Sequence, residues 1–83
     1  SMKRAELETW LISAGWTMDR WGHYQATRLL RGEDRKFRVK MQATSCRYEV
    51  KTNSGDWLKF ANDYYKNCEI VDNALKIGNR TII

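Results

Sequence analysis

The sequence has no proline, two cysteines and one histidine among its 83 residues. No glycine- and serine-rich or low-complexity stretch divides the chain, so we expect residues 1–83 to form a single domain. Ser1 is expected to be a scar of proteolytic cleavage. No apolar leader opens the chain, and no apolar run approaches the ~20 residues that a membrane-spanning helix needs. We therefore expect a soluble, cytoplasmic protein with no membrane partner.

The same shortages limit the chemistry that the chain can carry. Cys46 and Cys68 are too few for a disulfide framework and too far apart in the sequence for a paired metal-ligand motif. They are expected to be reduced thiols that pack as small apolar side chains. The sequence has no glycine-rich phosphate loop and no cluster of His, Cys and Asp at metal-ligand spacing. We expect no metal ion and no cofactor, and a conventional enzyme is disfavoured.

Positive charge, in contrast, is in excess and is concentrated in one segment. The chain carries 15 Lys and Arg against 10 Asp and Glu, a formal net charge of +5. Within residues 35–51 the single acid Glu49 stands against a set of basic residues: Arg35, Lys36, Arg38, Lys40, Arg47 and Lys51. This segment alone accounts for the net charge, because the charges of the remaining residues cancel. An anion is therefore the expected partner.

Hydrophobic periodicity predicts one helix at the start of the chain. Apolar residues fall at i, i+3, i+4 and i+7, which is typical of an amphipathic helix: Leu7, Trp10, Leu11 and Ala14. Gly15 is placed to end this helix. Extended segments are expected at 16–20 and 23–30, with turns at 19–22 and 31–34.

The best-specified unit is a hairpin within residues 36–51. Apolar and charged residues alternate in both halves, which predicts two half-buried strands joined by residues 42–45. If Met41 faces Cys46, the register pairs apolar residues on one face, Val39 with Tyr48 and Phe37 with Val50. The other face then carries the charged pairs, Lys40 opposite Arg47, Arg38 opposite Glu49 and Lys36 opposite Lys51.

Residues 57–66 allow two interpretations. In the first, Ser54 or Asp56 caps a helix that runs through this segment. In the second, residues 57–60 form a strand that pairs with residues 46–52. We favour a short strand followed by a helical turn at 62–66. Residues 70–77 are expected to form a second hairpin with Asp72-Asn73 at its turn. The predicted fold class is α+β, with an N-terminal amphipathic helix packed on one face of an antiparallel, hairpin-rich sheet.

The charged face of the 35–51 hairpin is the candidate functional site. Like charges opposite each other destabilise a sheet by a few tenths to about 1 kcal/mol per pair, and a bound anion reverses that effect. Side chains on one face of a strand repeat about every 6.6 Å, which suits the backbone of a nucleic acid. The expected phosphate contacts are Lys36, Arg38, Lys40, Thr44, Ser45, Arg47 and Lys51. Trp21 and Tyr24 are candidates for stacking on unpaired bases, and Tyr64-Tyr65-Lys66 is a second aromatic cluster of this kind. Trp10, Trp16 and Trp57 are expected in the core.

The expected function is therefore a small basic module that binds the phosphate backbone of RNA or of single-stranded or duplex DNA. Two alternatives remain open. In one, the Lys and Arg side chains serve only to keep the protein soluble. In the other, they bind an acidic protein surface, as those of an adaptor or a small inhibitor would.

A third alternative comes from a short motif. A helix that ends in Ala14-Gly15-Trp16, followed by Arg20-Trp21-Gly22-His23-Tyr24, resembles the opening of HicA-type toxins over about residues 7–40. These small proteins have a fold related to double-stranded RNA-binding domains, and their corresponding histidine serves RNA cleavage. The resemblance implies that the protein is a ribonuclease toxin in which His23 is catalytic.

Overall fold

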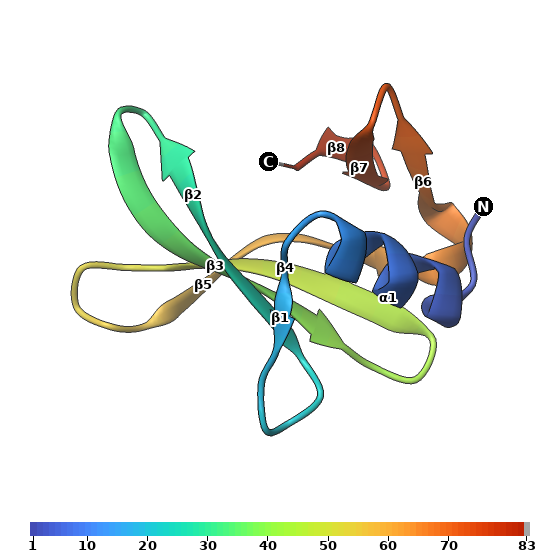
Figure 1. The fold of residues 1–83 in the computed structure, drawn as a ribbon, viewed down its shortest axis with the longest axis horizontal. Coiled ribbons are helices and arrows are strands. Elements are labelled where there is room, and N and C mark those ends of the chain that lie inside the picture. Colours follow the sequence, from blue (N-terminus) through green and yellow to red (C-terminus); the bar gives the residue numbers. More distant parts are fainter. Residues whose placement is uncertain (83) are drawn as a thin grey trace.

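The computed structural model describes residues 1–82. The fold is α+β, as predicted, with one helix and strands in two antiparallel sheets. Its elements, shown in Figure 1, are α1 (Arg4–Ser13), β1 (Thr17–Met18), β2 (Tyr24–Leu30), β3 (Glu33–Met41), β4 (Ser45–Lys51), β5 (Trp57–Tyr64), the 3-10 helix η1 (Tyr65–Asn67), β6 (Cys68–Val71), β7 (Ala74–Ile77) and β8 (Arg80–Thr81). The expected single domain also includes residue 83, which lies outside the described residues. No helix within residues 1–82 has the length and apolar character to cross a bilayer.

The helix α1 forms where the apolar periodicity predicts it. Leu7 and Leu11 are fully buried, and Trp10 packs partly against the same core. At the start of α1 the Glu6 carboxylate accepts a hydrogen bond from the backbone N–H of Lys3, at 2.9 Å. After the helix Gly15 has a φ of +91°, the left-handed conformation in which a glycine ends a helix without strain.

The hairpin of β3 and β4 has the predicted register over most of its length. The recorded pairs run from Met41 with Cys46 to Phe37 with Val50. The predicted pairing of Lys36 with Lys51 is wrong, because the two strands part beyond Phe37. On the opposite sides of the two strands, Lys36 pairs with Thr27 of β2 and Lys51 pairs with Trp57 of β5.

The strand β5 corrects the favoured interpretation of residues 57–66. A continuous strand occupies Trp57–Tyr64, so residues 62–64 are extended rather than helical, and only η1 follows. The strand part of that interpretation is confirmed, because β5 returns on β4. The alternative of a helix through this segment is wrong. The register shifts between Tyr48, opposite Ala61, and Glu49, opposite Lys59, so Phe60 has no partner in β4. This β-bulge breaks the alternation of apolar and polar residues that identifies a strand in a sequence.

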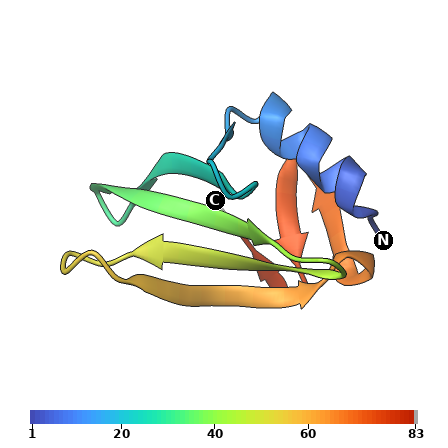
Figure 2. The ribbon, with the colours of Figure 1, turned by 90° about the horizontal axis from the view of Figure 1, so that it is seen from below.

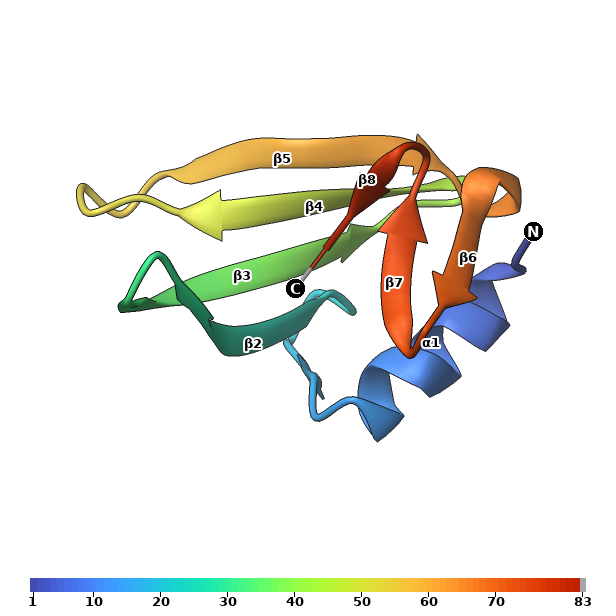
Figure 3. The same cartoon turned by 90° about the horizontal axis from the view of Figure 1, so that it is seen from above.

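The two sheets and the helix form two layers. The five-stranded sheet has the order β1-β2-β3-β4-β5, and β6, β7 and β8 form the second sheet. Figure 3 shows β7 and β8 lying across β3–β5, with α1 beside them. One core cluster joins the layers, with Leu11 from α1, Val39 and Tyr48 from the five-stranded sheet, and Leu75 and Ile77 from β7. The predicted second hairpin is thus confirmed. Together with α1 it packs on one face of the five-stranded sheet.

Candidate nucleic-acid interface

The other face of the five-stranded sheet is not covered by α1 or by the second sheet. In Figure 2, which looks from below, β3, β4 and β5 lie in front of the second sheet, and α1 lies to one side of them. Because Phe37, Val39 and Met41 are buried, the residues that alternate with them point to the uncovered side. We call this surface the outer face and define it by Gln25, Lys36, Arg38, Lys40, Arg47, Glu49, Lys51, Trp57, Lys59 and Asn62.

A buried carboxylate organises the middle of the outer face. Glu49 is 4 % exposed and accepts hydrogen bonds from Nε and Nη2 of Arg38, at 2.8 and 2.6 Å. Nε of Arg47 lies 3.0 Å from the other carboxylate oxygen, as an ion pair that is not aligned for a hydrogen bond. The predicted Arg38–Glu49 contact is present, but sequence reasoning missed that Glu49 also contacts Arg47. One carboxylate therefore fixes two guanidinium groups side by side.

The structure places the two predicted stacking residues, Trp21 and Tyr24, in different environments. Tyr24 is 1 % exposed in the core, so the prediction that it stacks on a base is wrong. Burial raises the pKa of its hydroxyl, with a smaller contribution of the same sign from Glu8. Tyr24 faces inward because it pairs with Val39, a core residue of β3. Trp21 is 67 % exposed, and the guanidinium of Arg20 lies 5.0 Å from its ring centre.

The loop that carries Trp21 lies on the same side as the outer face. Figure 1 shows the β1–β2 loop extending below the five-stranded sheet, opposite to β6–β8. The Asp19 carboxylate holds this loop by accepting hydrogen bonds from the backbone N–H groups of Trp21 and His23, both at 3.0 Å. Its other oxygen accepts a bond from Nε2 of Gln25, at 3.1 Å. Burial alone would raise the pKa of Asp19, but these hydrogen bonds outweigh it and hold the pKa below its usual value.

Trp57 lies on the outer face, which corrects its expected place in the core. It is half-buried at the start of β5 and lies opposite Lys51. The guanidinium of Arg38 lies 4.3 Å from the centre of its ring, and Nζ of Lys51 lies 5.8 Å from it. A cation at this distance over an indole is an attractive contact. Sequence reasoning missed Trp57, Lys59 and Asn62 as residues of the outer face. The predicted strand at 57–60 already contains the first two of them.

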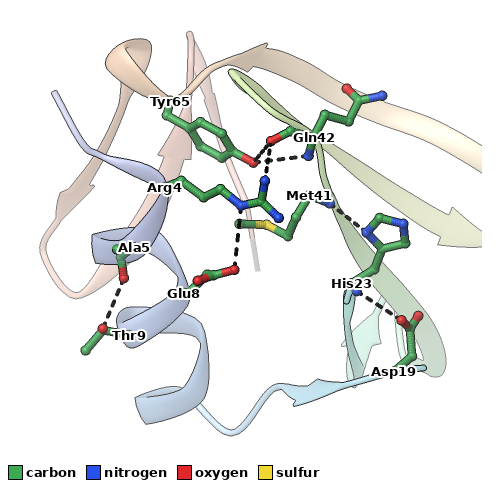
Figure 4. A network of polar contacts seen from close by, with 9 residues as sticks. All are labelled: Arg4, Ala5, Glu8, Thr9, Asp19, His23, Met41, Gln42 and Tyr65. Atoms are coloured by element: carbon green, nitrogen blue, oxygen red, sulfur yellow. Dashed lines mark hydrogen bonds and ion pairs between the residues drawn. The ribbon is translucent and has the colours of Figure 1, made fainter. Parts of the chain in front are cut away.

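Thr44 and Ser45 lie at the turn that joins β3 to β4, beyond the charged pairs. The hydroxyl of Ser45 donates a hydrogen bond to Oε1 of Gln42, at 3.0 Å. The turn is anchored to the rest of the molecule through the carbonyl oxygen of Gln42, which accepts bonds from the Tyr65 hydroxyl at 2.6 Å and from Nη1 of Arg4 at 3.2 Å (Figure 4). The two hydroxyls therefore sit at the end of the outer face, on a fixed turn.

His23 is held in one tautomer. Its Nδ1 accepts a hydrogen bond from the backbone N–H of Met41, at 2.9 Å (Figure 4). Because that N–H can only donate, Nδ1 carries no proton, and in the neutral ring the proton is on Nε2. Burial lowers the pKa of His23, opposed by Asp19 and supported by the charges of Lys40 and Arg38. The ring is therefore a hydrogen-bond donor and is unsuited to act as a general base.

Within residues 1–82 no group of three or more His, Cys, Asp or Glu side chains is placed to hold a metal ion. No protein-family model, curated protein or solved structure matches the chain. The resemblance to HicA-type toxins is thus carried by the motif residues alone. The interface has to be interpreted from its own geometry and charge.

Proposed function

We propose that this protein is a non-enzymatic nucleic-acid-binding module that holds a phosphate backbone across its outer face. One observation carries the proposal: an uncovered sheet face presents cations from three neighbouring strands. They are Lys36, Arg38 and Lys40 of β3, Arg47 and Lys51 of β4, and Lys59 of β5. Glu49 is the acid among them, and it is buried beneath Arg38 and Arg47.

The spacing of these cations supports a backbone contact. Neighbouring strands lie about 4.8 Å apart, and side chains on one face of a strand repeat about every 6.6 Å. A grid of this kind places several cations within reach of consecutive phosphates, and such contacts carry no base information. The Glu49 carboxylate reduces the number of conformations open to Arg38 and Arg47 before the ligand arrives. Less entropy is then lost on binding than with a flexible basic tail.

His23 has a non-catalytic role in this proposal. Tyr24 pairs with Val39, and in this antiparallel register His23 therefore lies next to Lys40. The imidazole is thus beside the outer face. With its proton on Nε2 it is a neutral donor for a phosphate oxygen or a base. The ribonuclease alternative needs an unprotonated Nε2, which the Met41 N–H disfavours by occupying Nδ1.

The test is fluorescence anisotropy of a labelled 12-nucleotide single strand over a series of salt concentrations. We expect the logarithm of affinity to fall against the logarithm of salt with a slope of about −3 to −4, if about five phosphates are neutralised. The double variant Lys36→Glu and Lys40→Glu reverses two charges that the structure does not pair with Glu49. It is expected to weaken binding at least tenfold and to reduce the slope.

The matched control reverses two charges of the second sheet, Lys76→Glu with Arg80→Glu, and so changes the net charge equally. It is expected to stay within about threefold of the unsubstituted protein. The proposal fails if nothing binds at low salt, or if the control loses as much affinity as the outer-face variant. Equal affinity for a labelled polyglutamate peptide would replace the nucleic acid with an acidic protein surface.

A further inference from the structure

Beyond its charged pairs the outer face ends at an exposed aromatic ring. Tyr64 is the last residue of β5 and lies opposite Ser45, two residues along each strand from the pair of Arg47 and Asn62. Its side chain is 55 % exposed. The next residue, Tyr65, is buried, so the chain turns inward directly after Tyr64. The ring therefore stands at the end of the path that the cations define.

Tyr64 lines two separate open hollows. One hollow of about 260 Å³ is lined by Ser45, Asn62, Asp63 and Tyr64. The other, of about 540 Å³, is lined by Lys3, Arg4, Ala43, Thr44, Tyr64, Tyr65 and Lys66. Tyr64 borders open space at both hollows, and its side chain is largely exposed. A planar group is thus able to lie against it.

The larger hollow combines an apolar wall with a cationic rim. Ala43, Tyr64 and Tyr65 supply the wall, and Nζ of Lys66 lies 5.6 Å from the centre of the Tyr64 ring. The Thr44 side chain, with its hydroxyl, is exposed at the same hollow. An apolar aromatic surface next to ammonium groups suits a nucleobase together with its phosphate.

The one acid at the smaller hollow, Asp63, is held by its neighbours. Its carboxylate accepts hydrogen bonds from Nδ2 of Asn67, at 2.8 Å, and from the backbone N–H of Tyr64, at 2.7 Å. These bonds lower the pKa of Asp63 and keep the carboxylate ionised. Asp63 pairs with the buried Cys46, and its Oδ2 lies where a side chain on Gly78 would meet it, so the carboxylate faces the second sheet rather than the outer face. Asp63 therefore leaves the outer side of Tyr64 free for a ligand.

Trp57, at the other end of β5, is less available for stacking. The guanidinium of Arg38 lies over its ring at 4.3 Å, so one face is already occupied. The cation beside Tyr64, Nζ of Lys66, lies farther from its ring, at 5.6 Å, and the Tyr64 side chain is more exposed than that of Trp57. The distance from the Lys51 row to the Ser45 row is six residues of strand, about 20 Å. A few nucleotides of extended single strand span this length, at the small end of the range for compact binding domains.

We propose that the ligand is a single-stranded nucleic acid, with its phosphates along the outer face and one unpaired base stacked on Tyr64. The inference rests on the proposed function and narrows its substrate class. A duplex is disfavoured because its bases are stacked on each other and paired, and so offer no free face to the ring. Base stacking on an aromatic side chain tolerates any base, so little sequence preference is expected.

The experiment compares three labelled probes at constant salt: a 12-nucleotide DNA strand, the RNA strand of the same sequence, and the blunt DNA duplex. At least one single strand is expected to bind tenfold or more tightly than the duplex. Tyr64→Ala is expected to weaken single-strand binding at least fivefold, with the salt slope unchanged because no phosphate contact is lost. Tyr64→Phe keeps the ring and should bind like the unsubstituted protein.

The matched control is Leu58→Ala, which removes another side chain of β5 that is 58 % exposed but lies outside the outer face. It is expected to leave binding unchanged, and urea denaturation checks that each variant is folded. If Tyr64→Ala binds normally while Lys36→Glu with Lys40→Glu does not, the stacking inference is overturned and the proposed function stands. Duplex binding as tight as single-strand binding also overturns it. If the charge reversals have no effect, the proposed function itself falls.

Discussion

At the scale of single residues, the side chains that define the outer face owe their positions to polar contacts that lie beneath or beside them. Glu49 holds Arg38 and Arg47, and Asp19 holds the loop that carries Trp21. Burying a carboxylate is unfavourable unless it is paired, and both guanidinium groups of this cluster serve that need. The contacts that compensate for the burial of the Glu49 carboxylate therefore also orient Arg38 and Arg47 on the outer face.

The lowered pKa of His23 predicts how the stability of the protein depends on pH. The pKa of His23 is lowered from 6.5 in the folded protein, so the unfolded chain binds more protons between the two values. Stability is therefore complete above pH 6.5 and decreases as pH falls toward the folded-state pKa. His23→Asn retains an acceptor oxygen for the Met41 N–H and does not titrate. Urea midpoints between pH 5 and 7.5 should slope for the unsubstituted protein and be flatter for this variant. Equal slopes would show that the pKa of His23 is not lowered in the folded protein.

Sequence reasoning placed charged residues more accurately than aromatic ones. The alternation around Arg38 and Lys40 fixes which side of the strand they occupy, because a charged side chain is rarely buried without a partner. An aromatic side chain is stable on either side of a sheet. Tyr24 and Trp57 were consequently assigned to the wrong sides, and the partner of each, Val39 or Lys51, is what decides its position.

At the scale of elements, the residue at the β2–β3 turn limits the stability of that hairpin. Arg31, at the β2–β3 turn, has a φ of +51°, followed by Gly32 at +82°. Two successive positive φ values are typical of a type I′ turn, in which Asn-Gly is the preferred pair. The turn is shorter than the predicted 31–34 because Glu33 and Asp34 already belong to β3.

Arg31→Asn is therefore expected to stabilise the protein by about 0.5–1 kcal/mol, since asparagine adopts positive φ more readily than arginine. Urea denaturation measures the change. Arg31→Val is the control, because a β-branched residue is strained at positive φ and should destabilise the turn. Since Arg31 lies outside the outer face, Arg31→Asn should also leave oligonucleotide affinity nearly unchanged. Destabilisation by Arg31→Asn would contradict the turn assignment.

The elements differed in how far the sequence predicted them. The β3–β4 register was predictable because apolar residues on one face and charges on the other allow only one alignment. The full length of β5 was not, because Phe60 and Ala61 interrupt the alternation at the bulge and only the strand at 57–60 was predicted. The second hairpin was predictable from Asp72-Asn73, whose φ values of +51° and +62° match a tight turn.

At the scale of the whole molecule, two thiols mark where the layers meet. Cys46 of β4 and Cys68 of β6 are free and fully buried, as predicted, yet their sulfur atoms lie only 3.8 Å apart. The hydrogen bond between them, together with burial, raises the pKa of the Cys46 thiol. Their proximity was not predictable from a separation of 22 residues, since it depends on how the second sheet packs.

Both thiols are expected to be unreactive toward a water-soluble disulfide reagent in the native protein. They should become reactive together, because exposing either one requires the second sheet to separate from the first. Absorbance at the reagent's thiolate band, followed in buffer and in concentrated urea, measures the two rates. Rapid labelling of one thiol in buffer would show that the layers are not joined as described.

The location of the outer face was equally a property of the whole molecule. The sequence indicated which residues share a side of β3 and β4, but not that α1 and β6–β8 would both cover the opposite side. The sequence therefore predicted which charged residues form the candidate site. It did not predict that the site ends at Tyr64, because that depends on where β5 ends and η1 turns inward.

The bulge at Phe60 has an evolutionary consequence. In β3 and β4 the core and the candidate site use alternate residues of the same strands, so inserting or deleting one residue would exchange them and damage both at once. In β5 the extra residue resets that alternation, leaving Lys59 and Asn62 on one side while Ala61 returns to the other. Length variation among homologous chains should therefore be tolerated at this bulge and in the turns, and should be absent from β3 and β4.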